Sequence, residues 1–154
     1  MKDQVSFLNQ YYSVYVGSNN PLLIKEYALK QNVQYFVIPM FRKINFFSDV
    51  KSIFSLILIL RKLKPNIIHS FTPKAGLVCA ISGFICRVPI RINTFTGLIF
   101  PYKEGILKIV LSFIDYLICL LNTHTIAEGM GVKELLYKHN IIKKKVHIIG
   151  NGNI

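Results

Sequence analysis

The sequence predicts an α/β fold, a Rossmann-like parallel sheet with helices on both faces. Short runs rich in β-branched and aromatic residues alternate with longer apolar segments along the chain, which is the rhythm of repeated strand–helix–strand units. Two predicted helices open on a capping residue followed by proline, at Asn20-Pro21 and Thr72-Pro73. The 154 residues, 52% of them apolar, suit one domain with a sizeable core and exclude a disordered basic tail.

Each element follows from a local signal. The predicted strands are short, rich in Val, Ile, Tyr or Phe, and close on turn residues; they cover 12–16, 34–38, 66–71, 90–94, 123–127 and 145–149. The predicted helices lie between them, and their caps or prolines mark several boundaries, such as Ser48 at the start and Pro65 after the end of the third. These helices cover 2–10, 21–31, 48–63, 73–87, 103–121 and 131–139.

The helix predicted over 103–121 has an unusual pattern. Its charged and hydroxyl residues beyond Lys103 share one narrow stripe, formed by Glu104, Lys108, Ser112 and Asp115. Nearly every other residue of this helix is apolar. We therefore expect it to be buried on most sides or to lie against something apolar.

The charge and the cysteines narrow the class of protein. Lys and Arg outnumber Asp and Glu by 19 to 7, a net charge of +12, which permits nucleic acid, an anionic membrane face or phosphate-bearing ligands as partners. Nucleic acid is disfavoured because basic and aromatic residues are not interleaved, and the run Lys143-Lys144-Lys145 is interpreted as a solvated turn. The three cysteines indicate core thiols in a reducing compartment. With no convincing membrane span or signal peptide, we expect a cytoplasmic protein that touches the membrane.

Three groups of residues follow predicted strands at the edge where open α/β sheets bind ligands. The first contains His69 near a strand end, the capping Thr72, Lys74 and Gly76. A cation in the first turn of a helix opposes the helix dipole unless an anion binds there, and glycine permits close approach. The alternative is a hydrogen-bonded core histidine and a lysine that points to water.

The other two groups are weaker. Thr94, Thr96 and Gly97 follow the next strand and either bind sugar hydroxyls or phosphate or merely form a turn. Glu128 and Gly129 precede the last helix, where the carboxylate either faces a ligand or favours the helix N-terminus. The glycines form neither a dinucleotide-binding nor a P-loop signature. All three groups are expected on one rim of the sheet, which favours a shared crevice.

The stretch from Arg61 to Leu77, with its Thr72-Pro73-Lys74-Ala75-Gly76 block, resembles a motif of bacterial family 4 glycosyltransferases. Residues 88–98, 128–133 and 149–154 also resemble that family. The resemblance implies the N-terminal, acceptor-side half of a GT-B fold, in which two Rossmann-like domains face a cleft. It assigns residues 1–150 to this domain, with its first strand missing at the N-terminus, and residues 151–154 to the start of the hinge into an absent C-terminal domain.

The resemblance also implies a function. The enzyme would move a sugar from a nucleotide sugar to a lipid-linked glycan acceptor in capsule, lipopolysaccharide or other surface polysaccharide synthesis, with neither metal nor cofactor, at the inner face of the plasma membrane. By position, His69 and Lys74 would be catalytic, and the substrate-binding residues would be Thr72, Gly76, Thr94, Thr96, Gly97, Glu128 and Gly129. Since the donor domain is absent, we expect the chain alone to be inactive.

Two alternatives remain open. One is a non-catalytic membrane-surface or partner-binding remnant that keeps the fold. The other concerns the helix over 103–121: together with the basic charge it fits docking on anionic lipid, whereas packing against the sheet is the favoured interpretation.

Overall fold

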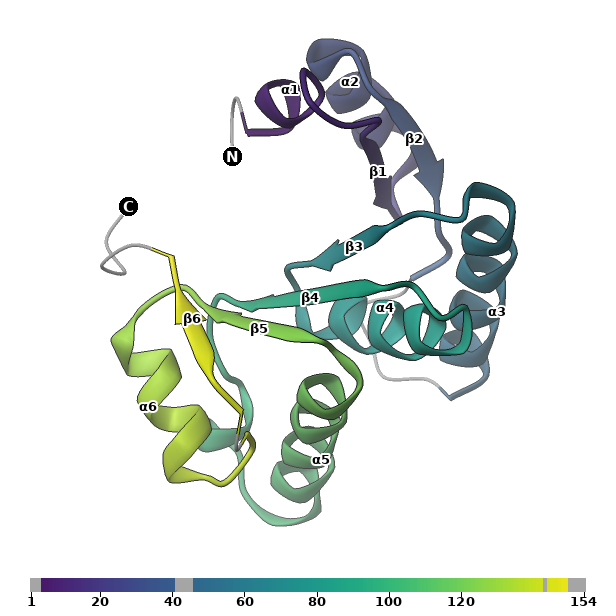
Figure 1. Cartoon of the computed structure of the whole chain (residues 1–154). Helices are drawn as coiled ribbons and strands as arrows, with labels where there is room; N and C mark the ends of the chain where they lie inside the picture. The colour runs from purple at the N-terminus through teal and green to yellow at the C-terminus, as the bar shows by residue number, and fades with distance from the viewer. Residues whose placement is uncertain (1–3, 41–45, 143, 150–154) are drawn as a thin grey trace. The chain divides into compact units, whose positions relative to one another are not determined.

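The computed structural model describes residues 4–40, 46–142 and 144–149. It confirms the α/β architecture, with parallel sheets flanked by helices (Figure 1). The strands form two sheets, one of two strands and one of four, and no ladder joins the two within the described residues. The chain divides into two compact units, residues 1–55 and 56–154, and this boundary falls inside the predicted 1–150 domain. Residues 150–154, which include the predicted hinge, and Lys143 lie outside the described residues.

The first unit contains α1 (Gln4–Leu8), β1 (Tyr15–Ser18), α2 (Pro21–Gln31), β2 (Gln34–Val37) and the start of α3 (Phe46–Leu63). The Asn20 side chain caps α2 as predicted, because it accepts hydrogen bonds from the backbone N–H groups of Leu22 and Leu23, each at 3.1 Å.

Several boundaries in this unit differ from the prediction, and two of them have a clear physical reason. The predicted first strand covers 12–16, whereas the observed strand runs from Tyr15 to Ser18, because these four residues pair in parallel with β2, Tyr15 opposite Gln34. The predicted cap at Ser48 is also wrong: α3 begins at Phe46, so Ser48 lies inside the helix and its carbonyl accepts a hydrogen bond from Ser52 Oγ at 2.8 Å.

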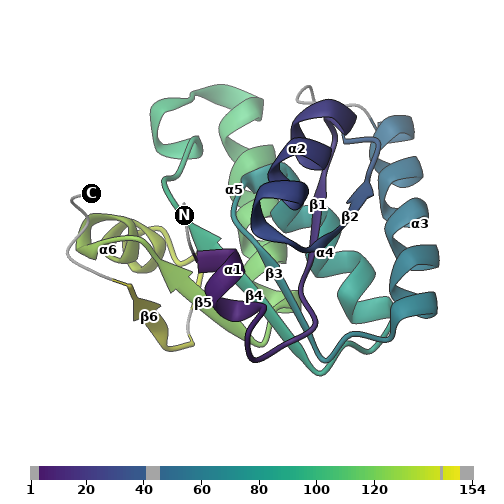
Figure 2. The same ribbon diagram turned by 90° about the horizontal axis from the view of Figure 1, so that it is seen from above.

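The second unit contains a four-stranded parallel sheet in the order β3 (Ile67–Ser70), β4 (Ile90–Phe95), β5 (His124–Ala127) and β6 (Val146–Ile148). The connections are α4 (Pro73–Ile85), a short 3₁₀ helix η1 (Phe100–Tyr102) followed by α5 (Gly105–Leu121), and α6 (Met130–Lys138). Helices α4 and α5 lie on the same side of this sheet (Figures 1 and 2). Because every strand is parallel, the carboxyl ends of β3, β4 and β5 share one edge.

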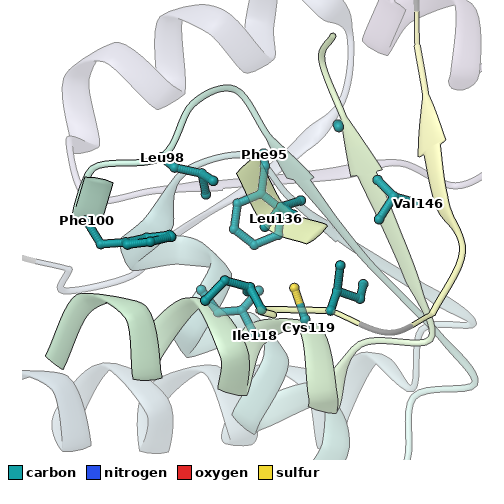
Figure 3. Packing of buried hydrophobic residues seen from close by; sticks show 10 residues of the cluster. Phe95, Leu98, Phe100, Ile118, Cys119, Leu136 and Val146 are labelled. Carbon is teal, nitrogen blue, oxygen red and sulfur yellow. The ribbon is translucent and has the colours of Figure 1, made fainter. Parts of the chain in front are cut away.

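One apolar cluster fills the space between this sheet and its helices (Figure 3). It joins β4, β5 and β6 to α5 and α6, and its buried members are Phe95, Leu98, Phe100, Ile118, Cys119, Ala127, Leu136, Ile141, Ile142 and Val146. Burial raises the pKa of the Cys79 and Cys119 thiols to about 12. These two groups remain neutral thiols; Cys119 lies in the core as predicted, whereas the side chains of Cys79 and Cys86 are only half-buried.

A buried polar contact fixes where α4 meets the sheet. The Asn93 side chain in β4 is 2% exposed, and its Oδ1 accepts a hydrogen bond from Ser70 Oγ of β3 at 2.8 Å. A Cβ atom on Gly76 in α4 would lie 2.7 Å from Asn93 Oδ1 and 3.1 Å from Ile118 Cδ1. Gly76 is therefore required by the close approach of α4 to the Asn93 amide.

Helix α5 is apolar on two opposite sides, one that packs Ile118 and Cys119 into the core and one that faces solvent. The predicted polar stripe points into the unit at Asp115, which is only 6% exposed, whereas apolar side chains on the opposite side are open to solvent, such as Ile106 at 81% and Phe113 at 61%. The expectation that this helix packs against the sheet is confirmed for the side that carries Ile118 and Cys119, whereas the opposite side stays exposed. No described helix is both long and apolar enough to cross a membrane.

We expect Gly76→Ala to lower the free energy of unfolding by about 1–3 kcal/mol, because the added methyl group overpacks the contact with Asn93. Gly131→Ala in α6 is the matched control: its Cβ meets nothing within 4 Å, so the change should be neutral or stabilise by up to about 1 kcal/mol. Urea unfolding measures both. In an Asn93→Ser background the Gly76→Ala penalty should shrink, and an unchanged penalty would contradict the contact.

Burial raises the pKa of Asp115 from 3.8 to about 7. The folded chain therefore binds a proton that the unfolded chain has released between these values, so this group makes folding less favourable as pH rises from about 4 to about 7. Asp115→Asn should increase the free energy of unfolding at pH 8 and have little effect at pH 4. The gain is limited to about 1.4 kcal/mol per pKa unit. Unfolding curves of both proteins from pH 4 to 8 test this, and a pH-independent difference would be the contrary result.

Candidate functional site

The structure brings together two residues that the sequence places in different groups. His69 lies in β3 and Thr94 in β4, and His69 Nε2 is 2.8 Å from Thr94 Oγ1. Thr94 is 7% exposed, whereas His69 is half-buried. Thr94 is thus placed to orient the imidazole at the carboxyl edge of the sheet.

The surroundings of His69 favour a neutral imidazole. Burial lowers its pKa, so the ring is uncharged near pH 7. Its ring centroid lies 4.1 Å from that of Phe71, just beyond the strand. Within the described residues, the contact with Thr94 is the only hydrogen bond that the ring makes. A neutral ring held in this way leaves Nδ1 to donate to or accept from a ligand, according to its tautomer.

The N-terminus of α4 follows directly after this pair. Thr72 adopts the extended capping conformation as predicted, and its Oγ1 accepts a hydrogen bond from Ala75 N–H at 3.3 Å. Pro73 has no N–H, and the Gly76 N–H donates to the Thr72 carbonyl at 2.6 Å. The helix terminus therefore satisfies most of its own N–H groups. The half-buried Lys74 adds a positive charge to the same turn.

The remaining predicted residues follow β4 and β5. Thr96, Gly97 and Glu128 are exposed, and a backbone hydrogen bond of 3.0 Å from Glu128 N–H to the Phe95 carbonyl ties the two loops together. Gly129 is buried at the start of α6. No hydrogen bond among the described residues joins the Glu128 side chain to His69.

The predicted site therefore has an exposed part and a supporting part. Thr72, Thr96, Gly97 and Glu128 are open to solvent, and His69 and Lys74 are half-buried. Gly76, Thr94 and Gly129 are buried, so a ligand reaches Gly76 and Thr94 only through their neighbours. A Cβ on Gly97 would meet nothing within 4 Å, so packing does not require glycine there. The assignment of these residues to substrate stays a prediction.

Sequence reasoning missed Ser70 and Asn93. Both are buried and hydrogen-bonded to each other. Ser70 directly follows His69 in β3, and Asn93 directly precedes Thr94 in β4. The available signal was an amide or hydroxyl residue inside a strand predicted to be covered on both faces, since a buried amide needs a partner. Among the described residues, no group of three or more His, Cys, Asp or Glu side chains is arranged to hold a metal ion.

Comparison with known proteins identifies the family of the chain. The family model described as "Glycosyl transferase 4-like" matches residues 1–123. The chain is 36% identical over 155 residues to the capsular polysaccharide biosynthesis glycosyltransferase CapM of Staphylococcus aureus, covering 99% of the chain and 40% of that protein. It is 28% identical over 127 residues to a UDP-Gal:alpha-D-GlcNAc-diphosphoundecaprenol alpha-1,3-galactosyltransferase of Escherichia coli, covering 80% of the chain and 33% of that protein. The chain thus spans well under half of each relative, and it belongs to the glycosyl transferase 4-like family.

Proposed function

We propose that this chain forms the acceptor-side half of a glycosyltransferase that moves a sugar from a nucleotide sugar to a lipid-linked glycan acceptor in bacterial surface polysaccharide synthesis. The observation that carries the proposal is the neutral His69, held by Thr94 beside the first turn of α4 with Lys74. The relative in Escherichia coli, whose acceptor is a diphosphoundecaprenol-linked sugar, supports this class of acceptor.

The side chains at the carboxyl ends of β3 and β4 suit such an acceptor chemically. The imidazole of His69 and the hydroxyl of Thr96 offer hydrogen bonds to sugar hydroxyls, and Lys74 offers a positive charge to the diphosphate. We assign no general base, because stabilising the charge of the leaving diphosphate is the larger electrostatic task. The proposal includes no metal ion or cofactor. It places the protein at the inner face of the plasma membrane, where nucleotide sugars and the lipid-linked acceptor meet.

The exposed apolar side of α5 specifically favours a second candidate, a non-catalytic protein that keeps the fold and binds a membrane surface. The two candidates differ in one measurable property. A glycosyltransferase half recognises the sugar diphosphate itself, whereas a membrane-binding remnant does not.

Acceptor binding by the chain tests the proposal. We expect saturable binding of a water-soluble GlcNAc diphosphate carrying a short alkyl chain, measured by titration calorimetry. Lys74→Ala and His69→Ala should each weaken it at least about tenfold, the loss of one charge-assisted or buried hydrogen bond. Lys62→Ala at the exposed end of α3 is the matched control and should bind normally. Circular dichroism checks that every variant is folded.

A transfer assay separates the two candidates. Labelled nucleotide sugar and lipid-linked GlcNAc diphosphate are incubated with the chain, with and without EDTA. Acceptor binding without transfer is the result expected of an acceptor-side half alone. Any transfer should persist in EDTA. Absence of acceptor binding at millimolar concentration would overturn the proposal and favour the membrane-binding remnant.

A further inference from the structure

The strand register fixes the contact between His69 and Thr94. In the parallel pairing of β3 with β4, His69 lies opposite Ile92. Thr94 is two residues beyond Ile92, so its side chain leaves the same face of the sheet as that of His69. The two side chains are therefore diagonal neighbours on adjacent strands, and His69 Nε2 lies 2.8 Å from Thr94 Oγ1. Regular backbone, and not a loop, holds this contact.

The hydrogen bond between these two atoms has two possible directions. Either the Thr94 hydroxyl donates its proton to an unprotonated Nε2, or a protonated Nε2 donates to the hydroxyl oxygen. Burial lowers the pKa of His69, so the neutral imidazole carries one ring proton. The first direction places that proton on Nδ1, whereas the second leaves Nδ1 without a proton. The direction therefore decides whether His69 offers a ligand an N–H donor or a base.

The burial of Thr94 favours the first direction. Thr94 is 7% exposed, and among the described residues its hydroxyl has no hydrogen-bond partner besides His69. If Nε2 donated, the hydroxyl proton would be buried without an acceptor, which costs free energy. If the hydroxyl donates, the group left open is Nδ1–H, which the half-buried ring of His69 can present to water or to a ligand.

The aromatic neighbour of the ring supports a fixed orientation. Phe71 packs against the imidazole of His69, with 4.1 Å between the ring centroids and 35° between the ring planes. This contact restricts rotation of the imidazole about its bond to Cβ, because rotation would bring the two rings into collision. Nε2 therefore stays directed at Thr94, and Nδ1 stays available.

We propose that Thr94 is a positioning residue that keeps the His69 proton on Nδ1, so that His69 presents an N–H donor to an oxygen of the ligand and does not act as a base. The ligand group that faces Nδ1 is then an oxygen with a free lone pair, on the diphosphate or on a sugar hydroxyl. The inference deepens the proposed function and rests on it for the identity of the ligand. The tautomer itself is a property of the free chain.

Long-range proton–nitrogen correlation NMR of the chain labelled with ¹⁵N-histidine measures the tautomer, because protonated and unprotonated ring nitrogens differ widely in ¹⁵N shift. The chain has four histidines, and the set of signals that His69→Gln removes belongs to position 69. At pH 8, where the ring is neutral, we expect a protonated Nδ1 and an unprotonated Nε2. A protonated Nε2 in the unsubstituted chain would overturn the proposal.

Three substitutions separate positioning of the proton from a structural role. Thr94→Val keeps the shape of the side chain and removes the hydroxyl, so the His69 signals should move toward a mixture of both tautomers. Thr94→Ser restores a hydroxyl donor and should restore the Nδ1–H signature. Thr96→Val is the matched control: it removes an exposed hydroxyl after the same strand and should leave the His69 signals unchanged. A pure Nδ1–H signature in folded Thr94→Val would contradict the role of Thr94.

Titration calorimetry connects the tautomer to the ligand. Thr94→Val should weaken binding of the short-chain GlcNAc diphosphate about threefold to tenfold, the loss of one hydrogen bond, and Thr94→Ser should bind normally. The same loss with inorganic diphosphate identifies a diphosphate oxygen as the acceptor, whereas a loss confined to the GlcNAc diphosphate identifies a sugar hydroxyl. Equal losses in Thr94→Val and Thr94→Ser would contradict the inference.

Failure of the inference and failure of the proposed function give different results. A protonated Nε2 together with normal binding of the GlcNAc diphosphate would refute the inference and leave the proposed function standing. An intact Nδ1–H signature together with no binding of the GlcNAc diphosphate would refute the proposed function and leave the tautomer standing. Circular dichroism of each variant establishes that it is folded.

Discussion

The buried amide of Asn93 is the contact on which the rest of the candidate site depends. It accepts a hydrogen bond from Ser70 and lies against Gly76, so one side chain connects β3, β4 and the first turns of α4. A polar group in such a site is favourable only when its partners are in place, which restricts the position of α4. His69 and Thr94 are the adjacent residues of the same strands, so their positions are restricted as well. His69 Nε2 lies 2.8 Å from Thr94 Oγ1.

This arrangement explains why the predicted site residues have different physical roles. His69, Lys74 and the loop residues after β4 lie where a ligand can reach them, whereas Gly76 and Thr94 are buried and act through what they touch. The helix terminus is largely satisfied by Thr72. Any preference for an anion at this edge therefore arises from the Lys74 charge and the helix dipole rather than from a row of open N–H groups.

The core cluster determines which side of helix α5 faces the protein. Its polar stripe was recognisable from spacing alone, but the spacing carries no information about which side faces the protein. The core cluster takes Ile118 and Cys119 from the side that also carries Asp115. This orientation buries the Asp115 carboxylate, which raises its pKa. It also leaves the opposite apolar side of the helix exposed to water. The exposed apolar side is thus a consequence of how the core of this unit is built.

The sequence by itself determined the order of strands and helices, the caps at Asn20 and Thr72, and the edge at which His69, Thr94 and Glu128 would lie, because these depend on local propensity and on the geometry of parallel strands. Only the tertiary structure decided that β1 runs from Tyr15 to Ser18, that Asn93 requires glycine at position 76, and that α5 leaves one of its two apolar sides exposed. These outcomes depend on strand register and on contacts between residues far apart in the chain, which no local pattern specifies.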